Sequence, residues 1–197
     1  MHNQTYYDRS MNVEVYPHLN MALEWLDDSL PRTAVDVGCG AGRDAMFLIE
    51  QGFTVHAFDN NDEAIARLRA LAKQHLKVSL LPQVSSFEQY DYPDAALITA
   101  CSSLFFCHPD LFPAVWAKVT QSLLSGGIFC GHFMGPNDSW ARMGWGDLSV
   151  HTHTQLTALF EQDYRVLDIY EHEADGATLL GREKHWHTYS VLAQKVT

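Results

Sequence analysis

The chain has 197 residues, 47% of them hydrophobic, which suits one globular domain with a sizeable core. Its 13 basic and 24 acidic side chains give a formal net charge of −11, which disfavours nucleic acid and anionic membranes as partners. The sequence shows neither a basic-plus-apolar leader nor a long apolar run, so we expect a cytoplasmic protein without signal peptide or membrane span.

The first 31 residues precede the first predicted strand. Residues 1–11 are polar, with Tyr6 and Tyr7 among them, and predict a lid-like end. Hydrophobic side chains then recur at helical spacing from Tyr16 to Leu26, before Pro31. We expect a helix packed on a sheet, and a tyrosine pair that either covers a ligand or anchors a loose end.

A short apolar strand, a glycine turn and a helix occupy residues 35–49. The three glycines have the spacing G-x-G-x-G: Gly38, Gly40 and Gly42. A second strand, residues 53–58, ends on Asp59, about 20 residues after the first glycine, where a carboxylate can accept hydrogen bonds from ribose hydroxyls. The pattern predicts a nucleoside-binding βαβ unit, in which the buried acid Asp36 needs a partner.

Helices and strands continue to alternate along the chain. The predicted elements are a helix at 62–73, a third strand Leu76–Leu81 ended by Pro82, an apolar strand at 95–100, a helix from Pro109 through Leu124 and a strand at 128–134. Residues 135–150 are irregular and aromatic, which is more typical of a functional loop than of an idle one.

The C-terminal part predicts one helix and two strands. The helix is capped by Thr152 or Thr154, and the strands run from Tyr164 to Glu173 and from His185 to Gln194, with turn chemistry at Asp175-Gly176. No repeat or second domain is visible in the sequence. We therefore expect residues 1–197 to form a single domain, with residues 1–31 as an N-terminal lid and helix.

Several of these runs resemble a known family. VDVGCGAGRDA at 35–45 resembles the first motif of class I S-adenosylmethionine-dependent methyltransferases, and HAFDNN at 56–61 resembles their second. LSGGIF at 124–129 resembles the family's start of the fifth strand, with Ser125 where proline is usual. More weakly, GREKHWHTYSVLAQK at 181–195 resembles the last strand of small tellurite-resistance-type methyltransferases.

This resemblance implies an α/β fold: a Rossmann-like seven-stranded sheet, mostly parallel with the last strand antiparallel, and helices on both faces. It also implies S-adenosyl-L-methionine as the cofactor. The residues that match the family's cofactor positions are Asp36, Gly38, Cys39, Gly40, Gly42, Asp59, Asn60, Ser86, Phe87 and Cys101.

Methyl transfer from a sulfonium is an in-line displacement, so the protein mainly aligns the reactants and excludes water. We expect a small-molecule acceptor, with His108 and His187 as candidate catalytic bases. The candidate substrate pocket consists of Tyr7, Phe105, Phe106, Trp140, Trp145 and Trp186. Because neighbouring strand residues face opposite ways, Trp186 and His187 cannot both point into it unless the strand bends.

Eleven histidines raise the possibility of a metal site, because His151/His153 and His185/His187 are both H-x-H pairs. Two histidines do not fill a zinc shell and methyl transfer needs no metal, so we expect none. The four cysteines form no C-x-x-C pair, and we expect them to be reduced thiols. Two alternatives stay open: a cofactor-binding regulatory protein without turnover, and a nicotinamide-dependent oxidoreductase. The acceptor and the oligomeric state are unknown.

Overall fold

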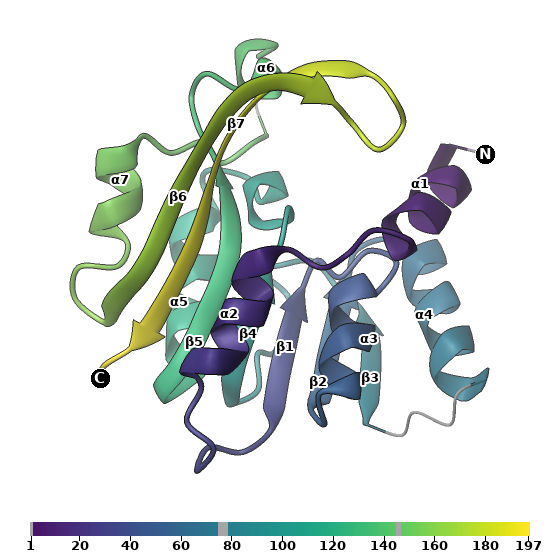
Figure 1. Ribbon diagram of the computed structural model, residues 1–197, viewed down its shortest axis with the longest axis vertical. Coiled ribbons are helices and arrows are strands. Elements are labelled where there is room, and N and C mark those ends of the chain that lie inside the picture. The colour runs from purple at the N-terminus through teal and green to yellow at the C-terminus, as the bar shows by residue number, and fades with distance from the viewer. Residues whose placement is uncertain (1, 75–78, 145–146) are drawn as a thin grey trace.

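A computed structural model describes residues 2–74, 79–144 and 147–197 of the chain (Figure 1). Its strands are β1 (Thr33–Val37), β2 (Thr54–Asp59), β3 (Leu80–Val84), β4 (Ala95–Ala100), β5 (Leu123–Met134), β6 (Tyr164–Ala177) and β7 (Glu183–Lys195). They form one sheet in the order β3-β2-β1-β4-β5-β7-β6. β7 is antiparallel to both of its neighbours and the other pairs are parallel, which confirms the predicted fold.

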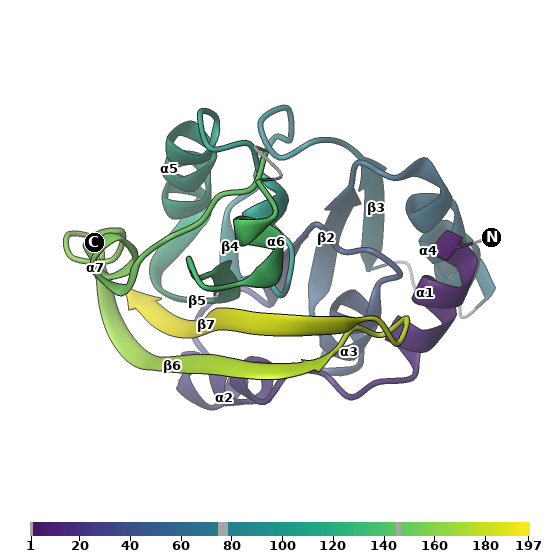
Figure 2. The same ribbon diagram turned by 90° about the horizontal axis from the view of Figure 1, so that it is seen from above.

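Helices cover both faces of this sheet (Figure 2). They are α1 (His2–Met11), α2 (Pro17–Trp25), α3 (Arg43–Glu50), α4 (Asp62–Gln74), the 3-10 turn η1 (Leu104–Phe106), α5 (Phe112–Ser122), α6 (Ser139–Arg142) and α7 (His153–Ala158). One core cluster packs α2, α3 and α4 on one face, and a second packs α5 and α7 on the other. Among the described residues, no helix has the length and apolar character to cross a membrane.

The third strand differs from its prediction. β3 continues through Pro82, which was expected to end it and instead pairs with Ala57 of β2. β3 is the outermost strand of the sheet, so proline's missing N–H deprives no further neighbour of a hydrogen bond. Residues 76–78 of the predicted strand lie outside the described residues.

Two other predicted boundaries were wrong. Leu123 and Leu124 fit the helical spacing of α5, but they belong to β5, where Leu123 pairs with Ala95. The expected turn at Asp175-Gly176 lies inside β6, because Asp175 pairs with His185 of β7. The chain reverses later, where the Thr178 N–H donates to the Arg182 carbonyl at 2.8 Å.

The hairpin of β6 and β7 is long enough to extend beyond the sheet and arch toward α1 (Figures 1 and 2). At its tip, Nη1 of Arg9 in α1 donates to the carbonyl of Leu179 at 2.5 Å. The N-terminal helix and this hairpin tip therefore meet above the carboxyl ends of β1 and β4, where open α/β sheets bind ligands.

Candidate functional site

The glycine turn between β1 and α3 brings the backbone close to two other segments. The Cys39 N–H donates to the Phe58 carbonyl at 2.9 Å, which ties the turn to the end of β2. Gly38 has a φ of 67°, and a Cβ there would lie 2.6 Å from Cβ of Ser103. Gly40 also has positive φ, 52°, but no described atom lies within 4 Å of where its Cβ would be. The space above Gly40 is therefore open to a ligand.

Asp59 stands at the end of β2 and is held by two backbone amides. Its Oδ2 accepts the Gly40 N–H at 2.9 Å, and its Oδ1 accepts the Asn61 N–H at 2.9 Å. Each carboxylate oxygen has a further lone pair, so both can accept one more hydrogen bond. The turn and the acid are thus locked together with acceptors available to two donors of a ligand.

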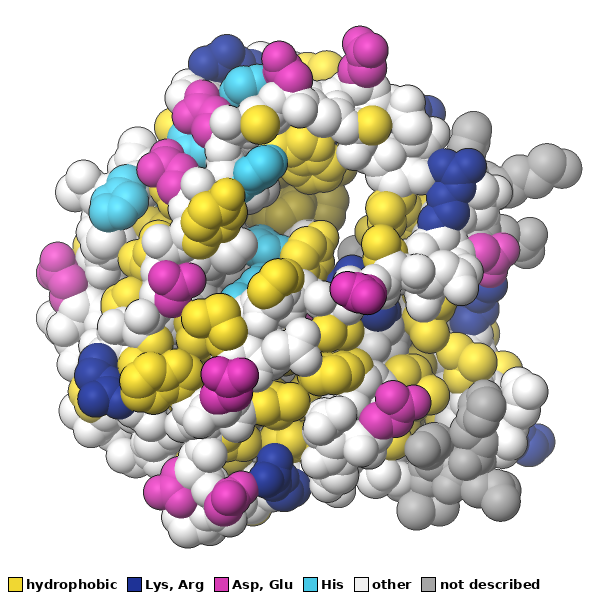
Figure 3. Space-filling model, viewed as in Figure 1, with side chains coloured by type: hydrophobic (Ala, Val, Ile, Leu, Met, Phe, Trp, Pro, Cys, Tyr) yellow, Lys and Arg dark blue, Asp and Glu magenta, His cyan; other side chains and the backbone are white. Residues whose placement is uncertain are grey.

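A cavity of about 750 Å³ opens over this turn. The surface is hollowed between the β6–β7 hairpin and the body of the protein, and hydrophobic side chains appear in the hollow (Figure 3). The cavity is lined by Tyr6, Tyr7, Gly38, Gly40, Phe58, Asp59, Asn60, Asn61, Ser85, Ser86, Phe87, Glu88, Ser102, Ser103, Phe106 and Trp140.

A smaller cavity adjoins the first, and Tyr6, Gly38, Gly40 and Ser102 line both. Asp36 borders it with a side chain that is 3% exposed, and its Oδ2 has no hydrogen-bond partner. Burial raises the pKa of Asp36 well above its usual value, and the neighbouring Asp44 carboxylate raises it further. An unpaired buried carboxylate oxygen at a cavity is a place for a ligand's donor.

Arg43 is the cation of this smaller cavity. Its Nε donates to Oδ1 of Asp44 at 2.6 Å, and its guanidinium carbon lies 4.6 Å from the centre of the Tyr16 ring. These contacts fix the guanidinium beside the glycine turn, because a planar cation stacked on an aromatic ring has few alternative rotamers.

Candidate cofactor residues from the sequence converge on these two cavities. Asp36, Gly38, Cys39, Gly40 and Cys101 line the smaller one, and Gly38, Gly40, Asp59, Asn60, Ser86 and Phe87 line the larger. Gly42 lines neither; it sits one turn deeper, where a Cβ would lie 2.3 Å from Cδ1 of Leu68.

The aromatic candidates divide into lining and supporting residues. Tyr7, Phe106 and Trp140 line the larger cavity, and the Phe106 and Trp140 rings are 6.0 Å apart. Trp186 packs against the Trp140 ring at 6.0 Å, and Phe105 is buried behind Phe106. Neither lines the cavity, so they support its wall. The remaining candidate, Trp145, lies outside the described residues.

Neither candidate base lines a cavity described above. The imidazole of His108 is on the surface, 43% exposed, near the carboxylates of Asp110 and Asp147. His187 is buried, and both of its ring nitrogens have partners: Nδ1 accepts the Asn137 N–H at 3.0 Å, and Nε2 lies 2.9 Å from Oε1 of Glu171. The geometry thus gives His187 the task of holding the loop after β5, and gives His108 no contact with the site.

Several site residues were missed by reasoning from the sequence alone. The clearest are Tyr16, Arg43, Glu88 and Ser102, all of which border one of the cavities. Arg43 directly follows the glycine turn, and this position was a usable signal. Ser102 and Tyr16 carry no local signal, because they come together only when α2 packs beside the end of β4.

Comparison with known proteins agrees with this geometry. Residues 34–127 match the sequence model of a methyltransferase domain. Residues 34–127 of this chain thus carry a methyltransferase domain, and the chain has the fold of S-adenosylmethionine-dependent methyltransferases. It is accordingly an enzyme, and the nicotinamide-dependent alternative is set aside. No curated protein matches its sequence.

Solved structures show how widely the methyltransferase fold is shared. TehB from Haemophilus influenzae superposes with a TM-score of 0.77 at 16% identity, over 98% of this chain and 67% of TehB. A methyltransferase from Methanosarcina mazei gives 0.71 at 18%, over 93% of this chain and 99% of that one. The 1,6-didemethyltoxoflavin-N1-methyltransferase from Burkholderia thailandensis, with its substrate and S-adenosylhomocysteine bound, gives 0.66 at 18%, over 92% and 79%.

The methyltransferase has two groups of side chains, among its described residues, that lie close enough to share a metal ion: His18, Cys101 and His132, and Glu171, Glu173 and His187. In each group one histidine Nδ1 accepts a backbone N–H, from Ser102 and from Asn137 respectively. In a neutral imidazole whose Nδ1 accepts a hydrogen bond, the proton is on Nε2. The ring nitrogens of His132 and His187 therefore have no free lone pair to offer a metal ion.

Treatment with a chelator should therefore leave the melting temperature and the cofactor affinity of the methyltransferase unchanged. The measurement is a thermal melt and a calorimetric titration before and after dialysis against EDTA. A stoichiometric metal in the purified protein, lost together with activity on chelation, would contradict this expectation.

Proposed function

We propose that this methyltransferase transfers the methyl group of S-adenosylmethionine to a small molecule that enters the larger cavity. The observation that carries the proposal is the pair of adjoining cavities over the glycine turn, with an unpaired carboxylate oxygen at one end and two aromatic rings at the other. A chain built only to bind the cofactor, without turnover, would not need space beside its reactive end.

The residues present fit the cofactor at each of its ends. The unpaired Oδ2 of Asp36 suits the ammonium of the amino acid, and the Arg43 guanidinium at the same cavity suits its carboxylate. Asp59 offers two acceptors to the ribose hydroxyls, and Phe87 and Ser86 line the wall next to it for the adenine. When bound, the cofactor supplies an activated methyl group on a sulfonium.

The remaining task of the chain is alignment and exclusion of water. Tyr6 and Tyr7 of α1 line the larger cavity from above, and α1 is fastened to the hairpin tip by Arg9. We propose that residues 1–31 act as a lid and helix within a single domain of residues 1–197. The aromatic pair Phe106 and Trp140 forms the wall against which an acceptor packs.

The proposed partner is thus a small-molecule acceptor, and the acidic balance of the chain argues against nucleic acid. All four cysteines are free thiols, which favours a reducing compartment such as the cytoplasm.

Replacing Asp59 by alanine should weaken cofactor binding by about 1–3 kcal/mol, because charge-assisted hydrogen bonds to the ribose are lost. Isothermal titration with S-adenosylmethionine measures the change. Asp62 is the matched control, since it is an acid three residues later, in the first turn of α4 and outside both cavities. Equal affinities in wild type and Asp59→Ala would remove Asp59 from the cofactor site.

A further inference from the structure

Ser102, just after β4, has an unusual backbone. Its φ of 56° makes it the one non-glycine residue with positive φ in the described part of the chain. Such a conformation costs free energy and persists only where the surrounding structure enforces it, most often at a functional site. Ser102 also borders both cavities, so it stands between the proposed amino-acid end of the cofactor and the aromatic wall.

Two hydrogen bonds from Ser102 to one nitrogen hold this conformation. Its backbone N–H donates to Nδ1 of His132 at 3.0 Å, and its Oγ lies 3.1 Å from the same atom. Because a backbone amide can only donate, Nδ1 has no proton, so in the contact with Oγ the Ser102 hydroxyl is the donor, and the amide and the hydroxyl share the single lone pair of Nδ1. Burial lowers the pKa of His132 well below its usual value, which keeps the ring neutral.

The direction of the next hydrogen bond follows from this. The Tyr16 hydroxyl lies 3.1 Å from Oγ of Ser102. Since the Ser102 proton is directed at His132, Tyr16 donates and Oγ accepts. A hydroxyl oxygen has two lone pairs, so one remains for a group in the cavity. Ser102 therefore presents a hydrogen-bond acceptor to the site, because its hydroxyl proton is directed at His132.

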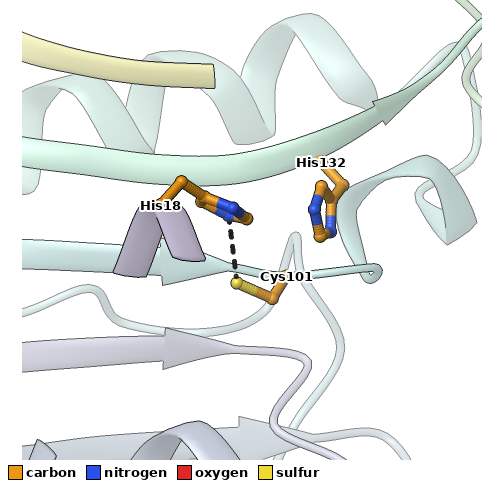
Figure 4. Close-up of side chains that lie close together, drawn as sticks. All are labelled: His18, Cys101 and His132. Atoms are coloured by element: carbon orange, nitrogen blue, oxygen red, sulfur yellow. Dashed lines mark hydrogen bonds between the residues drawn. The ribbon is translucent and has the colours of Figure 1, made fainter. Parts of the chain in front are cut away.

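The rings packed around Ser102 hold this direction of the hydrogen bonds at its hydroxyl. The His132 ring lies 4.3 Å from the Tyr16 ring and 4.6 Å from the His18 ring, edge to face in both cases. His18 and Cys101 point toward one another and are joined at 3.5 Å, with His132 beside them (Figure 4). Burial lowers the pKa of His18 to about 4, so the whole group is uncharged near neutral pH.

The charge of the larger cavity also favours a ligand that donates a hydrogen bond and carries no negative charge. Among its described lining residues the ionisable carboxylates are Asp59 and Glu88, and there is no lysine, arginine or histidine. No described side chain of this lining would offset the charge of an anionic acceptor, which would depend on the sulfonium of the cofactor alone while it meets two carboxylates and the lone pair of Ser102 Oγ.

We propose that Ser102 binds the methyl acceptor through its Oγ, and that the acceptor is a molecule whose nucleophilic atom carries a hydrogen (an amine, thiol or hydroxyl) and not an oxyanion. The X–H group donates to Oγ, which turns a lone pair of the nucleophile toward the methyl group. After transfer the new bond joins this atom to the methyl carbon, the carbon–sulfur bond breaks with its electron pair on sulfur, and the displaced proton passes to solvent when the product leaves the site. The inference rests on the proposed function, because it assigns the acceptor end of that same site.

The test compares acceptors and a variant. Aniline, benzyl mercaptan and phenol each carry an X–H group beside one six-membered aromatic ring, whereas benzoate and inorganic selenite are oxyanions. Transfer from methyl-labelled S-adenosylmethionine is measured for each. The variant is Ser102→Gly, which suits positive φ and removes only the hydroxyl, so that the protein should fold at least as well as wild type. The control is Ser125→Gly, an exposed serine at the far end of β5.

We expect transfer to at least one X–H acceptor and to neither oxyanion. Ser102→Gly should lose about tenfold or more in kcat/KM while its cofactor affinity and melting temperature stay at or above wild type. Transfer to selenite or benzoate, transfer to none of the five, or an unchanged kcat/KM in Ser102→Gly would overturn the inference. Failure of the wild type to bind the labelled cofactor would instead overturn the proposed function.

Discussion

Cofactor binding should be lost when Gly40 is replaced by valine, because the new side chain would occupy the open space above the glycine turn. No described atom lies within 4 Å of a Cβ at this position, so the side chain would meet the ligand and not the protein. The positive φ of 52° adds backbone strain of about 1–3 kcal/mol, which lowers the free energy of unfolding without by itself removing a binding contact.

Gly52→Val is the matched control for that strain. Gly52 also has positive φ, 85°, and open space around its Cβ position, but it follows the C-terminus of α3, away from both cavities. Both variants should melt at lower temperature, whereas only Gly40→Val should fail to bind S-adenosylmethionine in a calorimetric titration. Retained binding in Gly40→Val would mean that the cofactor does not cross this turn.

The largest loss of stability should follow from replacing Lys184 by methionine. Lys184 and Asp138 form an ion pair in which the two side chains are 1% and 0% exposed. Removing one partner leaves the other charge buried and unpaired, which costs about 3–5 kcal/mol. The ammonium also lies 4.4 Å from the Trp140 ring and 4.0 Å from the Trp186 ring, so these cation–π contacts would be lost as well.

The double variant Lys184→Met/Asp138→Asn is the control, since it removes both charges. The amide oxygen of asparagine can still accept the backbone N–H of Trp140, as Oδ1 of Asp138 does at 2.9 Å, and only the acceptor of the His187 N–H at Oδ2 is lost. Denaturant unfolding should therefore show the double variant to be more stable than Lys184→Met. A free energy of unfolding within about 1 kcal/mol of wild type for the single variant would show that this buried ion pair does not stabilise the fold.

The sequence points to the proposed cofactor half of the site because its signals are local. The glycines and Asp59 lie within one βαβ unit, and their spacing is typical of a turn that approaches a ligand. The acceptor half could not be predicted, because its residues come from distant segments. Tyr16 at the N-cap of α2, Ser102 after β4 and His132 from β5 meet only in the folded protein.

Alternation along a strand predicted that Trp186 and His187 face opposite ways, but not which of them faces the site. In the structure Trp186 packs on Trp140 behind the cavity wall, and His187 is bonded to Glu171 and to the loop after β5. Which of the two residues faces the site depends on the loop after β5, because the Asn137 N–H of that loop donates to Nδ1 of His187. Propensity and spacing carry no information about such a pairing.

A crystal structure with S-adenosylhomocysteine bound tests the site most directly. The assignment predicts the ribose on Asp59, the adenine beside Phe87, and the amino-acid end between Asp36 and Arg43. It also predicts that the sulfur faces the space between Ser102 and Phe106, within reach of a small acceptor. A ligand bound away from the turn at Gly38–Gly42, or one whose sulfur faces away from Ser102, would contradict this account.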